Sequence, residues 1–395
     1  MPRRTTLSIC VPSRNRQDCF RQTILDLIAS ERTDIEFVLA DNSDDPSIMD
    51  GFIAGLRDPR IRYLPSAGRP LSMADNWERT VAAAEGDWVC IIGDDDYLDP
   101  DVVDLIAVIE ARDTTVDAIG WNRAPFQWTS ARTEEKSIPF SLVNRIMRHT
   151  RDQIERRLFG WAAATIMPQC PYGLYHGAIP RRTLTRIAAT YSGRFFEHPT
   201  VDFDFCHKLV ASSDNFAYIN RPMSILGVAA SSNSAAVGDG AGVARAVEAY
   251  RSEYGDAYEK VTLATGFPFR AESGVAGNIM AAQVWFKTWY GHAYDGWQEN
   301  FARAVTAECS LWKDRASYER HVAGIDAAFR AWDGGRYLPL FQPRFVGHVE
   351  GPKFWGVHDN QLYVGQGIAG SETPRAFYRV LQDILPEHQT MEIVL

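Results

Sequence analysis

Apolar residues gather in short unbroken runs along the first 120 residues, and stretches with helical spacing separate these runs. The apolar runs are residues 7–11, 35–40, 61–64, 88–92 and 116–121. Between them, apolar side chains recur every three or four residues at 18–30, 72–84 and 101–112. Strands that are apolar throughout are buried on both faces, as in a parallel sheet covered by helices. The pattern predicts an α/β fold with a mostly parallel sheet flanked by helices.

The pattern becomes more mixed after residue 121. It predicts a strand at 173–179 and helices at 180–191 and 201–212. The Ser-, Gly- and Ala-rich residues 224–244 are typical of a mobile loop or linker.

The pattern divides the chain into three regions. We expect residues 1–120 and 121–240 to form the two halves of one sheet domain. Residues 241–395 are expected to form a mainly helical C-terminal region rich in aromatic residues. Short strand-like pieces and a last helix near 374–385 are expected to end the chain.

Composition and charge exclude several classes of protein. The chain of 395 residues is 46% hydrophobic, which suffices for a large core, and its net charge of −9 excludes free duplex nucleic acid as a partner. The six cysteines form no CxxC pair, so we expect reduced thiols. Neither a signal-peptide pattern nor a run of ~20 apolar residues is present. We expect a cytoplasmic protein, with peripheral membrane contact left open.

Candidate chemistry gathers in the acidic stretch GDDDYLDPD, residues 93–101. Asp99-Pro100-Asp101 is a typical helix start, with Asp99 as the N-cap. Asp94, Asp95 and Asp96 instead follow a buried strand, where like charges repel one another. A divalent cation would relieve the repulsion, and carboxylate oxygens suit Mg²⁺ or Mn²⁺ together with a phosphate ligand. A solvated acidic turn is the alternative.

Three motifs in order resemble the family 2 glycosyltransferases, which have the GT-A fold. They are ICVPSRNR (9–16), FVLADNSDD (37–45) and DNWERTVAAAEGDWVCIIGDDDYLDPD (75–101). The glycine-rich fingerprints of dinucleotide-binding and P-loop proteins are missing after every predicted strand. The resemblance covers residues 7 to about 120 and implies a Rossmann-like GT-A domain.

The resemblance implies a role for each residue of a donor site. A pocket for the nucleotide base and ribose would be lined by Pro12, Arg14 and Asp41. Asp75 and Asn76 would approach the nucleotide or the donor sugar. In the DxD motif, Asp94 would contact ribose or metal-bound water beside Asp95, and Asp96 would bind the metal directly. Alternatively, Asp41 could cap a turn, and Asn76 could be an N-terminal residue of a helix.

A second carboxylate is needed as the base that deprotonates the acceptor hydroxyl in an inverting transfer. The segment VDFDF (201–205) resembles the family's base motif, and Asp202 aligns with the base. Val201 stands where the family usually has Glu, and Glu197 is the second candidate for the base. Alternatively, Asp202 is only a first-turn acid behind Thr200, where a negative charge is favourable.

The resemblance implies a metal-dependent inverting glycosyltransferase that uses Mn²⁺ or Mg²⁺. A UDP-sugar is the favoured nucleotide-diphosphate donor, and the acceptor would be a glycan, a lipid-linked molecule or a small molecule, as in polysaccharide biosynthesis. A homo-oligomer stays open. Residues 227–238 lack the His that many relatives have, and Ser232, Asn233 and Ser234 are the candidates for phosphate contacts there. The alternatives are a sugar nucleotidyltransferase and a non-catalytic nucleotide-sugar-binding scaffold.

Overall fold

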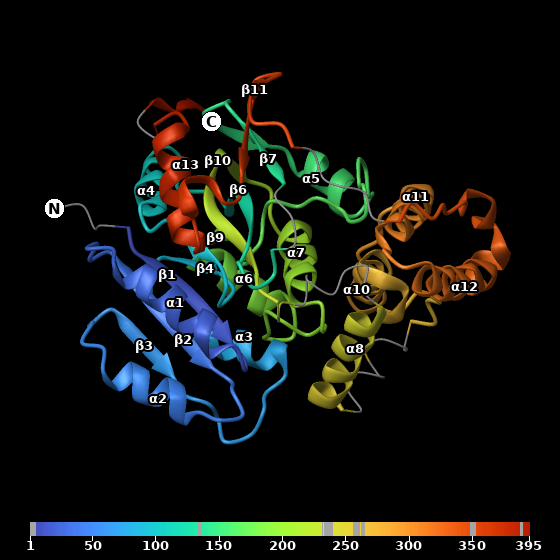
Figure 1. Ribbon diagram of the computed structural model, residues 1–395, viewed down its shortest axis with the longest axis horizontal. Helices are drawn as coiled ribbons and strands as arrows, with labels where there is room; N and C mark the ends of the chain where they lie inside the picture. Colours follow the sequence, from blue (N-terminus) through green and yellow to red (C-terminus); the bar gives the residue numbers. More distant parts are fainter. Residues whose placement is uncertain are drawn as a thin grey trace.

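A ten-stranded sheet forms the centre of the protein. The structure is a computed structural model that describes residues 5–132, 136–230, 232, 240–255, 261, 265–347, 353–387 and 390–395. The strands follow the order β13-β8-β10-β6-β9-β4-β1-β2-β3, with β5 paired to β10 (Figure 1). They are β1 (Leu7–Ser13), β2 (Ile35–Asp41), β3 (Ile61–Leu64), β4 (Trp88–Ile91), β5 (Tyr97–Leu98), β6 (Ala118–Gln127), β8 (Arg145–His149), β9 (Gly177–Pro180), β10 (Phe216–Val228) and β13 (Glu392–Val394). The strands β3, β2, β1 and β4 are parallel, so their carboxyl ends share one edge of the sheet.

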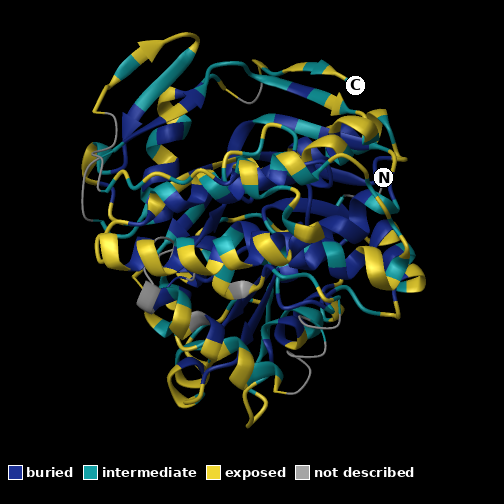
Figure 2. Cartoon of the chain, turned by 90° about the vertical axis from the view of Figure 1, so that its right-hand side faces the viewer, coloured by how far each residue is buried: buried dark blue, intermediate teal, exposed yellow. Residues whose placement is uncertain are grey.

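Helices cover both faces of this sheet. One face packs against α1 (Gln17–Ile28), α2 (Ser47–Ala54) and α4 (Val102–Arg112). The other face packs against α3 (Met73–Ala82), α5 (Arg151–Leu158), α6 (Arg181–Thr190) and α7 (Val201–Ala211). Alternate strand residues enter the two cores: Ile9 lies in the first and Cys10 in the second. Figure 2 shows the buried sheet between helices whose outer surfaces are exposed.

The α/β fold predicted from the apolar runs is confirmed, and the five strands predicted in the first 120 residues are present. Two later predictions are wrong. The strand predicted at 173–179 is shorter and later, because β9 covers only Gly177–Pro180. The segment read as a loop from residue 224 begins inside β10, and α8 (Gly240–Tyr254) starts before its end.

Part of the predicted helical C-terminal region has its own core. Aromatic side chains pack there between α10 (Gly274–Tyr290), α11 (Gln298–Glu308) and α12 (Arg315–Ala331). The short 3₁₀ turn η2 (Ala271–Ser273) precedes α10, and η3 (Cys309–Leu311) joins α11 to α12. Two more, η4 (Trp332–Gly335) and η5 (Leu338–Leu340), follow α12. Figure 1 shows these helices to one side of the sheet. The aromatic residues are therefore mainly core residues.

The end of the chain returns to the sheet domain. A second, three-stranded sheet joins β11 (Gly356–His358) and β12 (Gln361–Gly365) to β7 (Ser137–Ser141), and η6 (Ile368–Gly370) follows. The last helix, α13 (Pro374–Ile384), packs on β10, and β13 pairs with β8. The region after residue 241 is thus a helical insertion followed by a returning tail.

The returning tail explains Asp99. Its carboxylate accepts hydrogen bonds from Tyr378 and Gln382 of α13, both at 2.8 Å. The predicted N-cap role is wrong, because α4 begins at Val102 and Asp101 is its N-cap residue. Within the described ranges, none of the helices is both long and apolar enough to cross a bilayer.

Glu308 should make the stability of the helical insertion depend on pH. Its buried carboxylate accepts the N–H groups of Val275 and Ala276 at 2.7 and 2.9 Å, and burial raises its pKa to about 7. Because folding favours the protonated form, the contribution to stability is full below the unfolded pKa of about 4.3 and lost as the pH rises through 7.

We expect the free energy of unfolding to fall by up to roughly 3 kcal/mol more between pH 4.5 and 8 in the wild type than in Glu308→Gln. Urea unfolding at four or five pH values measures this difference. An identical pH dependence in both proteins would contradict the assignment.

Candidate active site

Arg16 lies between two carboxylates at the carboxyl ends of β1 and β4. Its Nε donates to Asp94 Oδ2 at 3.1 Å, a second nitrogen contacts Asp94 Oδ1, and Nη1 contacts Asp95 Oδ2 at 3.2 Å. Ser13 Oγ also donates to Asp94 at 2.6 Å. Burial raises the pKa of Asp94 and Asp95, and the Arg16 charge opposes that rise. A guanidinium therefore compensates much of the negative charge predicted here.

Asp96 is held from several sides by protein donors. Its Oδ2 accepts from the Gly93 N–H at 2.6 Å, from Tyr175 at 2.9 Å and from His176 Nε2 at 2.9 Å. Its Oδ1 accepts from the Gly227 N–H at 2.6 Å. Burial works to raise the pKa of Asp96, but the His176 charge and these hydrogen bonds lower it overall. Asp96 therefore stays ionised inside the fold.

The predicted metal fits Asp95 better than Asp96. Both Asp96 oxygens are engaged, whereas the hydrogen bonds of the Asp95 carboxylate with described residues all involve Oδ2 and leave Oδ1 for a ligand. The described part of the chain holds no cluster of three His, Cys, Asp or Glu residues around a common point. One carboxylate is enough for Mg²⁺ or Mn²⁺, which complete their shell with water and substrate phosphate. The role of Asp96 as the direct metal ligand stays a prediction.

Asp41 has an unused buried oxygen at the carboxyl end of β2. Its Oδ1 accepts from the backbone N–H and the hydroxyl of Ser43, at 3.1 and 2.6 Å. Its Oδ2 is buried and has no hydrogen-bond partner among the described residues. Burial raises the pKa of Asp41. Pro12 is buried in the neighbouring strand, where it pairs with Ala40. An unpaired carboxylate oxygen here can accept a ligand hydroxyl.

Arg14 pairs with Glu253 of α8 and lies 3.7 Å from Asp44. Helix α8 is therefore placed against the edge of the sheet at which the predicted nucleotide pocket lies.

Asp75 and Asn76 are already engaged by the protein. Asp75 accepts from Arg194 at 2.6 Å and from Ser72 at 2.9 Å. The amide oxygen of the buried Asn76 accepts from Arg79 Nε at 2.8 Å. These contacts support the structural reading of Asn76 as a helix residue.

Asp202 lies at the start of α7, where one of its oxygens remains available. Its Oδ1 accepts from the Phe203 N–H at 2.9 Å. Burial raises the pKa of Asp202, and this N–H and the Arg123 charge oppose the rise. One turn later, Cys206 Sγ contacts the Tyr172 carbonyl at 3.1 Å, so α7 lies beside the loop that carries Tyr175.

Glu197, the second candidate for the base, belongs to a buried network. Lys208 is fully buried, and its Nζ lies 2.8 Å from Glu197 Oε2 and 3.3 Å from Asp204 Oδ2. Tyr290 of α10 donates to the same Glu197 oxygen at 2.5 Å. The structure therefore favours a structural role for Glu197.

Two residues of the cluster were missed in the sequence. Tyr175 and His176 contact Asp96 from 79 and 80 positions away. Ser232 was predicted to contact phosphate but donates to Asp95, and Asn233 and Ser234 lie outside the described residues. The signal for His176 was weak, because it stands in an apolar segment read as a strand.

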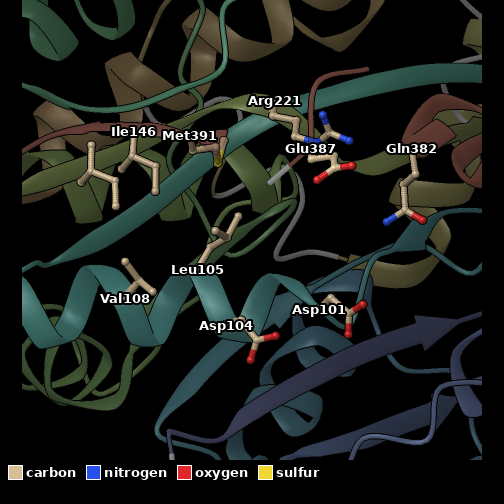
Figure 3. A pocket seen from close by; sticks show the side chains of 10 residues that line it. Asp101, Asp104, Leu105, Val108, Ile146, Arg221, Gln382, Glu387 and Met391 are labelled. Carbon is tan, nitrogen blue, oxygen red and sulfur yellow. The ribbon is translucent and has the colours of Figure 1, made fainter. Parts of the chain in front are cut away.

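A separate cavity of about 510 Å³ lies between α4 and the returning tail. Figure 3 shows Leu105 and Val108 of α4 on one side, with Arg221, Gln382 and Glu387 across from them. The described residues that line it include none of the predicted donor or base residues.

Residues 8–165 match the family described as Glycosyl transferase family 2. A comparison with curated protein sequences finds no match. The crystal structure of S. aureus TarS 1-349 is 13% identical, with a TM-score of 0.45, over 85% of this chain and 90% of that chain. The same fragment in complex with UDP-GlcNAc has 13% identity and a TM-score of 0.43 over the same shares.

Proposed function

We propose, from the match of residues 8–165 to the family described as Glycosyl transferase family 2, that this chain transfers a sugar from a nucleotide-diphosphate donor to an acceptor hydroxyl. The transfer inverts the anomeric carbon, and UDP is the first nucleotide to test. The acceptor is a hydroxyl of a glycan, a lipid-linked molecule or a small molecule. A cytoplasmic location stays a prediction.

The observation that carries the proposal is the meeting of Asp41, Asp94 and Asp95 at one edge of the sheet. Ligands of such sheets bind beyond the carboxyl ends of the strands. The unpaired Asp41 Oδ2 suits a ribose or base donor group. Asp95 has an oxygen left for a cation that would neutralise the diphosphate leaving group. We propose that Asp95, beside Asp94, holds Mn²⁺ or Mg²⁺.

Asp202 is the proposed general base. The Phe203 N–H orients its carboxylate through Oδ1, which leaves Oδ2 to accept the proton of the acceptor hydroxyl. Burial raises the pKa of Asp202 toward that of a better proton acceptor. As the acceptor oxygen attacks the anomeric carbon, the bond to the nucleoside diphosphate breaks on the opposite side.

The sugar nucleotidyltransferase alternative is not favoured by the first loop. That reaction usually needs a glycine-rich loop with a free Arg or Lys after the first strand. Here the loop reads Ser13-Arg14-Asn15-Arg16, and both arginines pair with carboxylates.

A thermal-shift panel with UDP, GDP, dTDP and CMP, each with and without Mn²⁺, tests the donor site. We expect one nucleotide to stabilise the wild type in the presence of Mn²⁺, by about 2.7 kcal/mol at 100 times its Kd. Asp95→Asn should lose the metal-dependent part of the shift, because it removes the proposed ligand charge.

Asp104→Asn is the matched control. Asp104 is an exposed carboxylate of α4 that pairs with Arg32, so this variant should keep the whole shift. No shift of the wild type with any nucleotide would favour the non-catalytic scaffold. If Mn²⁺ changes the thermal shift of Asp95→Asn as much as that of the wild type, Asp95 is not a ligand of the proposed metal site.

A further inference from the structure

Strand β6 lies inside the main sheet yet leaves part of one face exposed. It is flanked by β10 and β9. Ala124 and Phe126 are buried, but Arg123 and Pro125, which alternate with them along the strand, are exposed. Interior strands of a covered sheet are normally buried on both faces. The carboxyl-terminal half of β6 therefore has an open surface on one side.

This open face is continuous with the aspartate cluster. Residues two apart on a strand share a face, so Arg123 lies on the same side of β6 as Trp121. Arg123 also pairs in register with Ser224 of β10. Trp121 Nε1 donates to Ser224 Oγ at 2.9 Å, and the same Oγ is 2.8 Å from His176 Nδ1. His176 in turn holds Asp96 through its other nitrogen.

The charge of Arg123 acts on both halves of the candidate site. Burial raises the pKa of Asp202 and of the Tyr175 hydroxyl, and the Arg123 charge opposes the rise at each. Tyr175 donates to Asp96, whereas Asp202 is the proposed base. The Arg123 charge therefore acts both on the proposed base and on a residue that holds the aspartate cluster.

Arg123 is also uncommitted, unlike the other arginines near the site. Arg14, Arg16 and Arg194 each pair with a carboxylate. Arg123 makes no hydrogen bond or ion pair with any residue that the structure describes. An exposed guanidinium at the floor of an acidic site is available to an anionic ligand.

We propose that Arg123 binds phosphate oxygens of a substrate between the aspartate cluster and Asp202. This inference rests on the proposed glycosyl transfer. A guanidinium presents parallel N–H donors that match two phosphate oxygens. The phosphate could belong to the nucleoside diphosphate or to a phosphorylated acceptor, and the two sources require the same chemistry at Arg123.

The test measures Kd by calorimetry in the wild type, Arg123→Gln and Arg123→Lys. The probes are the nucleoside diphosphate selected by the thermal-shift panel, its monophosphate, and glycerol 1-phosphate added to the diphosphate-saturated protein. If the donor supplies the phosphate, Arg123→Gln should raise the Kd for the diphosphate by roughly ten- to hundredfold and the Kd for the monophosphate much less. If the acceptor supplies the phosphate, only the Kd for glycerol 1-phosphate should rise. Arg123→Lys should recover part of either loss.

Arg157→Gln is the matched control. Arg157 is an exposed arginine of α5 whose charge acts on Tyr172 and Tyr218 rather than on Asp202. Unchanged affinity of Arg123→Gln for all three probes, in a protein that binds nucleotide normally, would overturn the role of Arg123 alone. A wild type that binds no nucleotide would instead overturn the proposed function.

Discussion

Asp202→Asn is expected to lower kcat by roughly 10²–10⁴-fold, the usual contribution of a general base. The amide keeps the shape of the side chain and can still accept the Phe203 N–H, but it cannot take up the acceptor proton. Release of nucleoside diphosphate from the sugar donor, with water as the acceptor, measures the rate. The Tm should stay close to that of the wild type, because the side chain is only half-buried.

Two neighbouring carboxylates serve as controls for this prediction. Asp204→Asn should mainly lower the Tm, since Asp204 accepts the N–H groups of Glu197 and His198 and contacts Lys208. Glu197→Gln should likewise lower the Tm. A normal rate in Asp202→Asn together with a large loss of rate in Glu197→Gln would identify Glu197 as the base instead.

Lys208→Met is expected to reduce the free energy of unfolding by about 3–5 kcal/mol. The ammonium group is fully buried and contacts both Glu197 and Asp204, so its removal leaves two neighbouring carboxylates without the positive charge between them. Breaking a buried pair by removing one partner costs far more than the pair contributes against an apolar replacement. Urea unfolding measures the change.

The matched control is Arg303→Gln in the exposed pair between Arg303 and Glu299. Water screens this pair, so its loss should change stability little. Equal small effects in both variants would mean that Glu197 and Asp204 tolerate the loss of Lys208, for example by binding protons. A rise in stability with falling pH in Lys208→Met alone would identify that response.

Much of the first half of the fold could be predicted, because its buried strands are apolar throughout. Strand β10 was not predicted, and its end was read as a loop for a physical reason. Its residue Gly227 looks like a loop residue, yet a side chain there would place Cβ 1.7 Å from the Asp95 carbonyl oxygen. The glycine is required by close packing inside a strand, and sequence periodicity does not report that requirement.

The carboxylates of the candidate site could be predicted better than their partners. A run of aspartates at the end of a strand is a local pattern, and parallel strands bring such ends together. The residues that compensate these charges come from other parts of the chain, as His176 does for Asp96. Arg123 carried no signal at all, because its exposure on an interior strand depends on how the helices cover the sheet.

The returning tail also has a consequence for synthesis of the protein in the cell. Tyr97 packs on Tyr378 and Asp99 bonds to Gln382, although these residues are separated by more than 250 positions. At typical elongation rates the ribosome needs on the order of ten seconds or more to proceed from β10 to β13. During that interval the β8 edge and the surface under α13 lack their native cover. A chaperone that shields this nascent surface would therefore raise the yield of folded protein.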